Sequence, residues 1–420
     1  MRSAPLLLRL VAPFNDKLRR GLAGRDRALE QLERWCALQR RTERPLFWVH
    51  APSVGEALMA QAIVSALRAQ RPELQIAFTH FSPSAERMRE RVGADVATYL
   101  PWDATETMQR ALALLQPAGI VFVRSEVWPT LARLARHRGV PVLLVNAVLS
   151  PTSSRLRPLA RYALQPAYQE LTAVGAIDAA AAARFELLNV PRARIVVTGD
   201  ARFDQVWQRV ETVDRSRDLL RRLADPTVTT IVAGSSWPTD EEHLIPVFRR
   251  MLSARLILAP HEPTEPHLKR LEKMLEHGSL THARLAHVEA HTDALPAVVL
   301  VDRVGVLADL YAIADLAYVG GAFHSAGVHS VVEPAALGVP VIFGPQHENA
   351  TEAQQLINAG GGLSIDSSNA LTVAFLELVA DTRKRTETGG SARNYVQSKL
   401  GGARRNAELI LQQIDPVTPL

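Results

Sequence analysis

The sequence of 420 residues contains one cysteine, Cys36, and no long uninterrupted hydrophobic run. A single cysteine excludes a disulfide framework and a zinc site with several cysteine ligands, and it fits a reducing compartment. A membrane-spanning helix needs roughly 18–20 consecutive apolar residues, and no window of the sequence reaches that length. Internal repeats and low-complexity tracts are also absent. These absences indicate a globular protein whose fold is not held together by disulfide bonds or by a zinc site with several cysteine ligands.

The composition agrees with that class. Hydrophobic residues make up 47% of the chain and charged residues 22%, as in soluble globular proteins. A chain of this length is too long for one hydrophobic core, so two domains are expected. The net charge is +5, and arginine is far more common than lysine. The excess of cations indicates an anionic partner without identifying it, and no feature points to nucleic acid.

The N-terminus combines apolar residues with cations. Residues 6–11 are apolar apart from Arg9, and Lys17, Arg19, Arg20, Arg25 and Arg27 follow them. A secretory signal would carry its charges first and end in small residues, so that interpretation is rejected. A segment lying in the surface of an anionic membrane fits the pattern better. The alternative is an ordinary N-terminal helix packed on its own domain.

Short apolar runs alternate with helical patterns, which predicts βα units and parallel sheets. Runs such as "GIVFV" are apolar at every position, as expected of strands buried on both faces. The predicted strands lie in residues 46–51, 75–80, 97–102, 119–126, 141–150, 172–177 and 194–199 of the first half, and in 229–236, 255–262, 297–303, 316–321, 339–345 and 361–365 of the second.

The helical, charge-rich segment 204–225 separates the two halves and has no strand-like run. We therefore predict an α/β protein of two Rossmann-like domains, residues 1–203 and 204–420, facing one another across a cleft. The second domain would include a closing C-terminal helix. Ligands bind beyond the carboxyl ends of the strands in such sheets.

Two glutamates follow strands of the first half. Glu56 lies in "APSVGEA", where a strand gives way to a helix, and Glu126 lies in "VRSEVWP". Either carboxylate would suit a general base in a cleft. A glutamate in the first turn of a helix also interacts favourably with the helix dipole, so both interpretations remain open for each residue.

The second half contains two loops suited to a ligand. Gly234, Ser235 and Ser236 follow a strand and precede a helix, where backbone N–H groups can bind phosphate. The stretch from Gly320 to Asn349 joins a glycine pair, a polar loop with His324 and His329, and a short helix starting near Glu333. Glycines allow close backbone approach to a ligand. The two histidines lack a third ligand at a suitable spacing, so no metal site is predicted.

Together these segments resemble a known family. "HAPSVGE", "YLPWD", "SEVWP", "VTGDARFD", "VAGSSWPTDEE", "LILAPHEP" and "GVHSVVEPAALGVPVIFGP" occur in this order. The ordered set is similar to the 3-deoxy-D-manno-octulosonic acid (Kdo) transferases of lipopolysaccharide assembly. The resemblance implies the GT-B fold and an inverting, metal-independent glycosyltransferase without a cofactor. It also implies CMP-Kdo as donor, a lipid A precursor (lipid IVA) as acceptor, and peripheral attachment to the cytoplasmic face of the inner membrane.

The resemblance also assigns roles to residues. Glu56 is implied as the general base that takes the proton of the acceptor hydroxyl. The implied acceptor-side residues are Ser53, Gly55, Glu126, Arg155 and Arg157, with Arg161 nearby. The implied donor-side residues are Arg202, Gly234, Ser235, Ser236, His261, Gly327, Val328, His329, Glu333, Asn349 and Glu352. A solvated helix face is the alternative interpretation of the three arginines.

Three segments depart from the family pattern. A segment that usually has Asn and Lys carries Asp200 and Arg202 here, a loop close to "MGEL" is "VGVL", and "GGHN" becomes "GVHS". Two alternatives to a Kdo transferase remain. One is another GT-B enzyme with a UDP-sugar, such as a lipid A disaccharide synthase-like transferase or a sugar-nucleotide epimerase. The other is a catalytically silent two-domain binding protein, because a fold alone does not fix a function.

Overall fold

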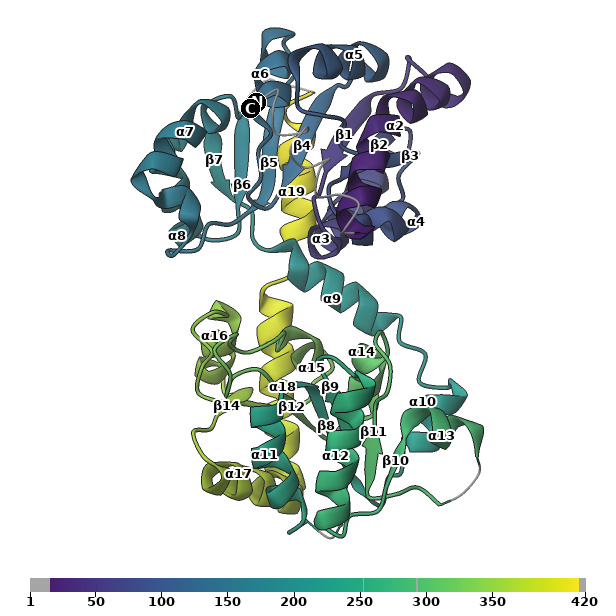
Figure 1. The fold of residues 1–420 in the computed structure, drawn as a ribbon. Helices are drawn as coiled ribbons and strands as arrows, with labels where there is room; N and C mark the ends of the chain where they lie inside the picture. Colours follow the sequence, from purple (N-terminus) through teal and green to yellow (C-terminus); the bar gives the residue numbers. More distant parts are fainter. Residues whose placement is uncertain (1–15, 252, 292–293, 415–420) are drawn as a thin grey trace. The chain divides into compact units, whose positions relative to one another are not determined.

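The computed structural model describes residues 16–251, 253–291 and 294–414. The predicted apolar segment at residues 6–11 lies outside them. The chain forms two compact units, residues 1–205 with 399–420 and residues 206–398 (Figure 1). No helix in the described ranges is long and apolar enough to cross a membrane. Each unit is an α/β unit with one seven-stranded parallel sheet.

The sheet of the first unit has the order β3-β2-β1-β4-β5-β6-β7. Its strands are β1 (Leu46–His50), β2 (Gln75–His80), β3 (Val96–Tyr99), β4 (Gly119–Val123), β5 (Val142–Ala147), β6 (Ala173–Ala176) and β7 (Ile195–Val197). Its helices are α2 (Asp16–Gln39), α3 (Val54–Gln70), α4 (Arg89–Val92), α5 (Thr105–Leu115), α6 (Pro129–His137), α7 (Pro158–Gln169), α8 (Ala179–Glu186) and α19 (Gly402–Leu411), and α9 (Ala201–Glu211) leads into the second unit.

Alternate residues of each central strand enter two separate cores. On β4, Ile120 and Phe122 belong to one core cluster, and Val121 and Val123 belong to the other. The all-apolar sequence of this strand is therefore explained by burial on both faces, as predicted.

The sheet of the second unit has the order β10-β11-β9-β8-β12-β13-β14. Its strands are β8 (Thr229–Ser236), β9 (Ala254–Pro260), β10 (His282–Arg284), β11 (Val298–Leu300), β12 (Leu316–Val319), β13 (Val341–Phe343) and β14 (Gly362–Ser364). Its helices are α10 (Asp218–Leu223), α11 (Pro238–Phe248), α12 (Glu265–His277), α13 (Leu285–Ala290), α14 (Leu307–Leu310), α15 (Val332–Ala336), α16 (Thr351–Asn358), α17 (Ser368–Ala380) and α18 (Thr382–Ser398).

The C-terminal helix corrects the predicted domain division. Helix α19 packs on α3 of the first unit and supplies Leu409 and Ile410 to one of its cores. Its buried Asn406 accepts hydrogen bonds from the backbone N–H of Asn146 and the hydroxyl of Thr198. The chain thus returns to the first unit after α18, and residues 204–420 do not form one domain as predicted.

Candidate active site

Both sheets place polar loops at their topological switch points. In the first unit β1 lies between β2 and β4, and in the second unit β8 lies between β9 and β12. Glu56 lies in the first turn of α3, which follows β1, and Glu126 lies in the loop after β4; Ser235 lies at the end of β8, and Gly321 lies in the loop after β12. Ligands of open α/β sheets bind at these crevices. The two loop pairs are therefore the candidate sites of the two units.

Glu56 is held by the start of its own helix. Ser53 is the N-cap of α3, and its backbone N–H donates to Glu56 Oε2 at 3.0 Å. The Ser53 hydroxyl donates to the same oxygen. This capping box fixes one carboxylate oxygen and leaves Oε1 without a partner in that motif. Glu56 is thus both a helix cap and a half-buried carboxylate at the switch point.

Glu126 shares the charge environment of Glu56. Burial raises the pKa of Glu126, Arg155 opposes this rise, the Glu56 carboxylate adds to it, and Arg25 opposes it. Arg155 and Glu126, both predicted for the acceptor side, are thereby brought together with the predicted base. Arg157 is exposed at the N-cap of α7, and Gly55 is exposed in the first turn of α3.

Arg25 was predicted as a membrane-facing cation, and the structure corrects this. Its side chain is buried, and its guanidinium lies 3.7 Å from the centre of the Phe81 ring. Burial is the main cause that lowers its pKa, and Glu126 acts in the opposite direction. Arg19 and Arg20 pair with Asp16 and Glu86. Arg25 therefore belongs to the site. Its sequence position, in a helix with several other cations, gave no sign of this role.

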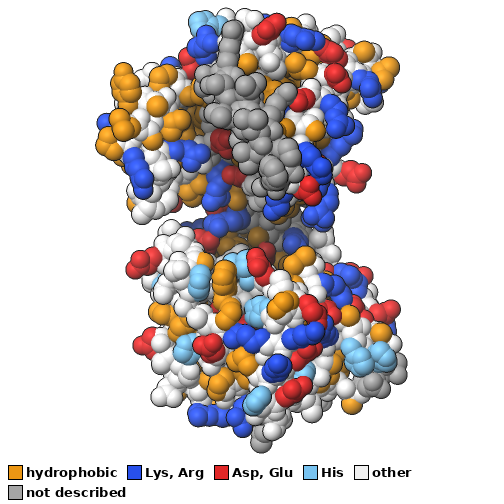
Figure 2. All heavy atoms as spheres, in the orientation of Figure 1, with side chains coloured by type: hydrophobic (Ala, Val, Ile, Leu, Met, Phe, Trp, Pro, Cys, Tyr) orange, Lys and Arg blue, Asp and Glu red, His pale blue; other side chains and the backbone are white. Residues whose placement is uncertain are grey.

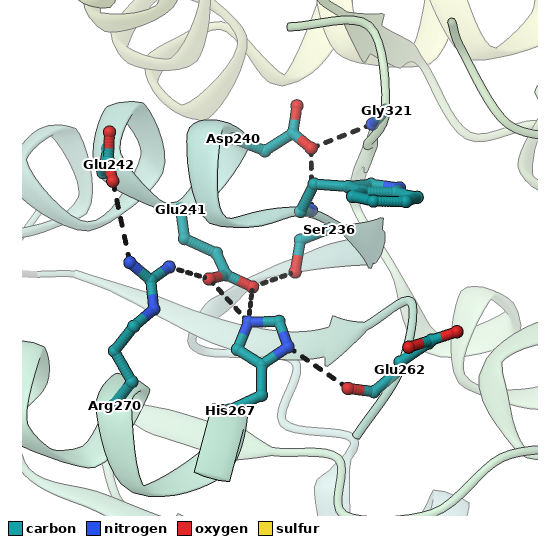
Figure 3. Close-up of polar contacts among 9 residues, drawn as sticks. Ser236, Asp240, Glu241, Glu242, Glu262, His267, Arg270 and Gly321 are labelled. Atoms are coloured by element: carbon teal, nitrogen blue, oxygen red, sulfur yellow. Dashed lines mark hydrogen bonds and ion pairs between the residues drawn. The ribbon is translucent and has the colours of Figure 1, made fainter. Parts of the chain in front are cut away.

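The turn after β8 has a strained backbone. Ser235 adopts a left-handed conformation with φ of 53°. A Cβ on Gly320 would lie 2.4 Å from the backbone oxygen of Ser235, so this close approach requires glycine. Asp240 links the two loops, because its Oδ2 accepts from the backbone N–H groups of Trp237 and Gly321 (Figure 3).

Beneath this turn lies a buried ionic network (Figure 3). Glu241 has no exposed surface, and its carboxylate accepts hydrogen bonds from the Ser236 hydroxyl at 2.9 Å and from Arg270 at 2.7 Å. His267 Nε2 lies 2.9 Å from both carboxylate oxygens. The Ser236 hydroxyl is therefore bound to Glu241, and contact of this turn with a phosphate falls to its main chain or to Ser235.

An aromatic group borders the same turn. The Trp237 ring stacks on His324 at 4.3 Å and on His261 at 5.2 Å, measured between ring centres. Its indole N–H donates to His329 Nε2 at 3.0 Å, so His329 is neutral with its proton on Nδ1. Burial and the neighbouring His261 lower the pKa of His329. The structure thus joins two predicted histidines through a tryptophan that the prediction omitted.

The remaining predicted residues lie around the same loops. A Cβ on Gly327 would lie 2.3 Å from Asn349 Oδ1, and Asn349 donates to the backbone oxygen of Val328 at 3.0 Å. Burial raises the pKa of Tyr311, and Glu333, in the first turn of α15, raises it further. Glu352 is in the first turn of α16. Arg202 belongs to the first unit, where its side chain pairs with Asp200 at 3.1 Å.

Comparisons with known proteins identify the family. The model of a family described as 3-deoxy-D-manno-octulosonic-acid transferase (kdotransferase) matches residues 29–205. The 3-deoxy-D-manno-octulosonic acid transferase of Bordetella pertussis is 30% identical over 379 residues, which cover 86% of each chain. The chain belongs to the Kdo transferase family. The Haemophilus influenzae member is 28% identical over 375 residues and also covers 86% of each chain.

Solved structures support the fold at low sequence identity. The UDP-GlcNAc 2-epimerase of Neisseria meningitidis has a TM-score of 0.61 and 11% identity, covering 88% of this chain and 99% of that one. A glycosyltransferase of Rickettsia africae has a TM-score of 0.57 and 12% identity, covering 88% and 98%. The predicted GT-B fold is confirmed, and membership of the Kdo transferase family confirms a glycosyltransferase.

Sequence reasoning missed several residues that build this Kdo transferase site. Asp240 and Glu241 look like acidic residues favouring the start of a helix, and their burial has no sequence signal. His267 and Arg270 lie on α12, about 30 residues away in sequence from their partner Glu241. The adjacent acidic pair after "GSSWP" was the one available sign of a special turn.

Proposed function

We propose that the chain transfers Kdo from CMP-Kdo to a lipid A precursor (lipid IVA), as a peripheral protein at the cytoplasmic face of the inner membrane. Family membership supports the reaction. The observation that carries the site is the pair of carboxylates, Glu56 and Glu126, at one switch point, with Arg155 and Arg25 acting on the charge of Glu126. A base and a cationic binding surface are what transfer to a phosphorylated acceptor requires.

Glu56 is the base of the proposed reaction. It accepts the proton of an acceptor hydroxyl as that oxygen forms a bond to the anomeric carbon of Kdo. The bond from this carbon to the phosphate oxygen breaks on the opposite side, and CMP leaves with the electron pair. The configuration at the anomeric carbon is therefore inverted. The Ser53 contacts fix Glu56 Oε2, which directs Oε1 to the acceptor.

The second unit would hold the donor. The main chain of the Ser235–Ser236 turn, just before the N-terminal end of α11, suits the CMP phosphate. Glu333 suits the ribose hydroxyls, and the stacked rings of Trp237, His261 and His324 suit a planar or anionic ligand group. Asn349, Gly327 and Val328 would shape the same pocket.

The deciding experiment incubates the purified protein with CMP-Kdo, generated in situ, and a tetraacylated lipid A precursor. Mass spectrometry of the lipid should show an increase by one or more Kdo units. Glu56→Gln should lower the rate by about 10²–10⁴-fold, because a positioned general base contributes that much. CMP should still raise the melting temperature of this variant.

Glu106→Gln is the matched control. Glu106 is an exposed glutamate in the first turn of α5 of the same unit, away from the switch-point loops. It should keep wild-type turnover. A Glu56→Gln variant that transfers Kdo normally would remove Glu56 from the mechanism. A melting temperature that rises with UDP and not with CMP would instead favour a UDP-sugar enzyme. A wild type that binds ligand but shows no turnover would favour a binding protein.

A further inference from the structure

Six residues other than glycine have a positive φ within the described ranges, and they form two groups of three. One group is exposed and lies at or just after the ends of helices, where a left-handed residue is an ordinary way to end a helix. Its members are Gln116, Asn189 and Ser279. The other group lies at the carboxyl ends of β4, β5 and β8, the edges where open α/β sheets bind ligands. Its members are Arg124, Asn146 and Ser235.

Arg124 is the least expected residue of the second group, with a φ of 82°. An asparagine tolerates this region because its short side chain can hydrogen-bond locally, and an arginine has no such compensation. Neighbouring contacts impose the conformation. The Arg124 N–H donates to the Val145 oxygen at 2.9 Å, and the Arg124 oxygen accepts from the Val148 N–H at 3.0 Å. The Tyr168 hydroxyl donates to the next carbonyl, that of Ser125, at 2.5 Å. Strain that the surroundings fix in this way is typical of functional sites.

The Arg124 side chain is half-buried, and no carboxylate in the described part of the chain lies at ion-pair distance from its guanidinium. Its side-chain hydrogen bond goes to Met59 Sδ at 3.8 Å, and a thioether is a weak acceptor. The charges that act on Glu126 come from Arg155, Arg25 and Glu56, so Arg124 is not used to balance that carboxylate. A cation withdrawn from water is ordinarily paired. An anion from outside the chain would complete this pairing.

The guanidinium lies one helical turn from the proposed base. Met59 follows Glu56 by three residues on α3, so the two side chains share one face of the helix. Asn146 reaches the same thioether from β5, with Nδ2 at 3.1 Å from Met59 Sδ. The register between β5 and β6 shifts at this position, and such bulges re-aim side chains beside active sites. The strained backbones of Arg124 and Asn146 thus direct two side chains to the start of α3.

We propose that Arg124 binds an oxyanion of a substrate next to Glu56. This step rests on the proposed function, because it takes Glu56 to be the base. The carboxylate of Kdo and a phosphate of the acceptor both have the required chemistry, and a guanidinium binds either group through paired N–H···O bonds. Figure 2 shows Lys and Arg side chains along the edge of the first unit from which α9 leaves in Figure 1, so an anion would be attracted to this edge.

The first test removes the charge. Arg124→Met should lower kcat/KM for Kdo transfer by about 10–100-fold, the loss expected for a charge-assisted hydrogen bond. Arg124→Lys keeps the cation without the paired geometry and should recover part of the loss. A rise in KM confined to CMP-Kdo would identify the carboxylate as the bound anion. A rise confined to the lipid acceptor would identify its phosphate.

Arg138→Met is the matched control for charge. Arg138 is exposed at the C-terminal end of α6 in the same unit, shortly before β5 begins. Its position is therefore at the amino ends of the strands, the edge opposite to the site. This variant should transfer Kdo like the wild type.

The second test separates strain from charge. Glycine adopts a positive φ without steric cost, so Arg124→Gly should raise the melting temperature by about 2–4 °C. It should nevertheless transfer Kdo as poorly as Arg124→Met. Gln116→Gly is the control, because Gln116 is an exposed residue with a φ of 43° that ends α5 of the same unit. This variant should gain similar stability and keep wild-type transfer.

A third measurement requires no transfer. Inorganic phosphate and free Kdo are added separately at constant ionic strength, and the melting temperature is recorded. At least one of them should stabilise the wild type and Arg138→Met more than Arg124→Met. If this difference is found in a protein that does not transfer Kdo, the anion site stands and the reaction is contradicted.

Three results would overturn the proposal. Arg124→Met could transfer Kdo with unchanged KM and kcat, which would leave the proposed function standing without this residue. Neither anion could stabilise the wild type more than Arg124→Met. Arg124→Gly and Arg124→Met could both melt at lower temperature and still transfer normally, which would make Arg124 a structural residue of the turn after β4.

Discussion

The Glu241 carboxylate and the Arg270 guanidinium form an ion pair of 2.7 Å in which the carboxylate has no exposed surface. Glu241 also accepts the Ser236 hydroxyl and contacts His267. Removing one member of a buried pair leaves a charge without compensation, which is far more costly than losing an exposed pair. The turn above this carboxylate therefore depends on a residue of α12.

Arg270→Ala should destabilise the second unit by about 3–5 kcal/mol, measured by urea unfolding. Arg303→Ala is the matched control, because both arginines are 38% exposed and differ in their partners. The Arg303 partner, Glu289, is 34% exposed, so its loss should cost no more than about 1 kcal/mol. Equal effects of the two substitutions would contradict the special role of Glu241.

Gly320→Ala should abolish stabilisation of the protein by CMP. The new Cβ would lie 2.4 Å from the Ser235 oxygen and 2.7 Å from Ser236 Cα, both backbone atoms that cannot move aside cheaply. The measurement is the rise in melting temperature on adding CMP. Gly390→Ala is the control within α18, where a Cβ meets no atom within 4 Å. It should keep the CMP response and raise stability by up to about 1 kcal/mol.

The strands were the predictable part of this fold. Runs such as "GIVFV" show burial on both faces directly, and all seven strands of the first sheet overlap predicted runs. Strand β10, "HAR", was missed because it is a three-residue edge strand without an apolar run. The return of α19 to the first unit depends on Asn406 bonding Thr198, a contact between residues 208 positions apart that no local pattern encodes.

The candidate site also contains residues that could be predicted from the sequence and residues that could not. Glu56 and Glu126 follow strands, so the rule for parallel sheets found them. Arg25 and Glu241 could not be found, because burial of a charged side chain depends on what packs over it. The sequence of a cation-rich helix or an acidic first turn looks the same whether it is solvated or buried.

His50 should make the first unit sensitive to acid. Burial, followed by the neighbouring His80, lowers the pKa of His50 to about 3, and burial lowers the pKa of His80 to about 4. Unfolded histidines titrate near 6.5, so below that pH the unfolded state binds more protons. The stabilisation is complete above pH 6.5 and is lost as pH falls toward 3, by up to about 1.4 kcal/mol per pH unit for each histidine.

His50→Gln should make the unfolding free energy less dependent on pH between pH 7 and 5, because the unfolded state would take up one proton fewer. The measurement is the free energy of unfolding in urea at several pH values in this range. The variant will also be less stable at pH 7, because His50 accepts the Trp128 N–H at 3.0 Å. The slope, not the absolute stability, is therefore the readout. His137→Gln, at an exposed position of α6, should leave the slope unchanged. An unchanged slope in His50→Gln would show that His50 does not resist protonation.

Asp200 and Arg202 stand where the resemblance leads us to expect Asn and Lys, and their ion pair of 3.1 Å suggests the hypothesis that the two changes compensate. Asp200 accepts from the Arg202 backbone N–H at 2.9 Å and from Asn146 at 3.3 Å, and its side chain is 10% exposed. Arg202→Met should leave this carboxylate without its cation and lower stability. Asp200→Asn/Arg202→Met should recover it, with a coupling of about 1–3 kcal/mol in the double-mutant cycle.

The same cycle separates a structural from a donor-binding role of Arg202. The exposed pair Arg192–Glu186 of the same unit is the control, and its coupling should stay below about 1 kcal/mol. If Arg202 also contacts the donor, the double variant will regain stability while its affinity for CMP-Kdo stays low. If the double variant regains both stability and affinity for CMP-Kdo, the role of Arg202 is only to neutralise the charge of Asp200. Absence of coupling would contradict compensation, and the two departures would then be independent changes at the start of α9.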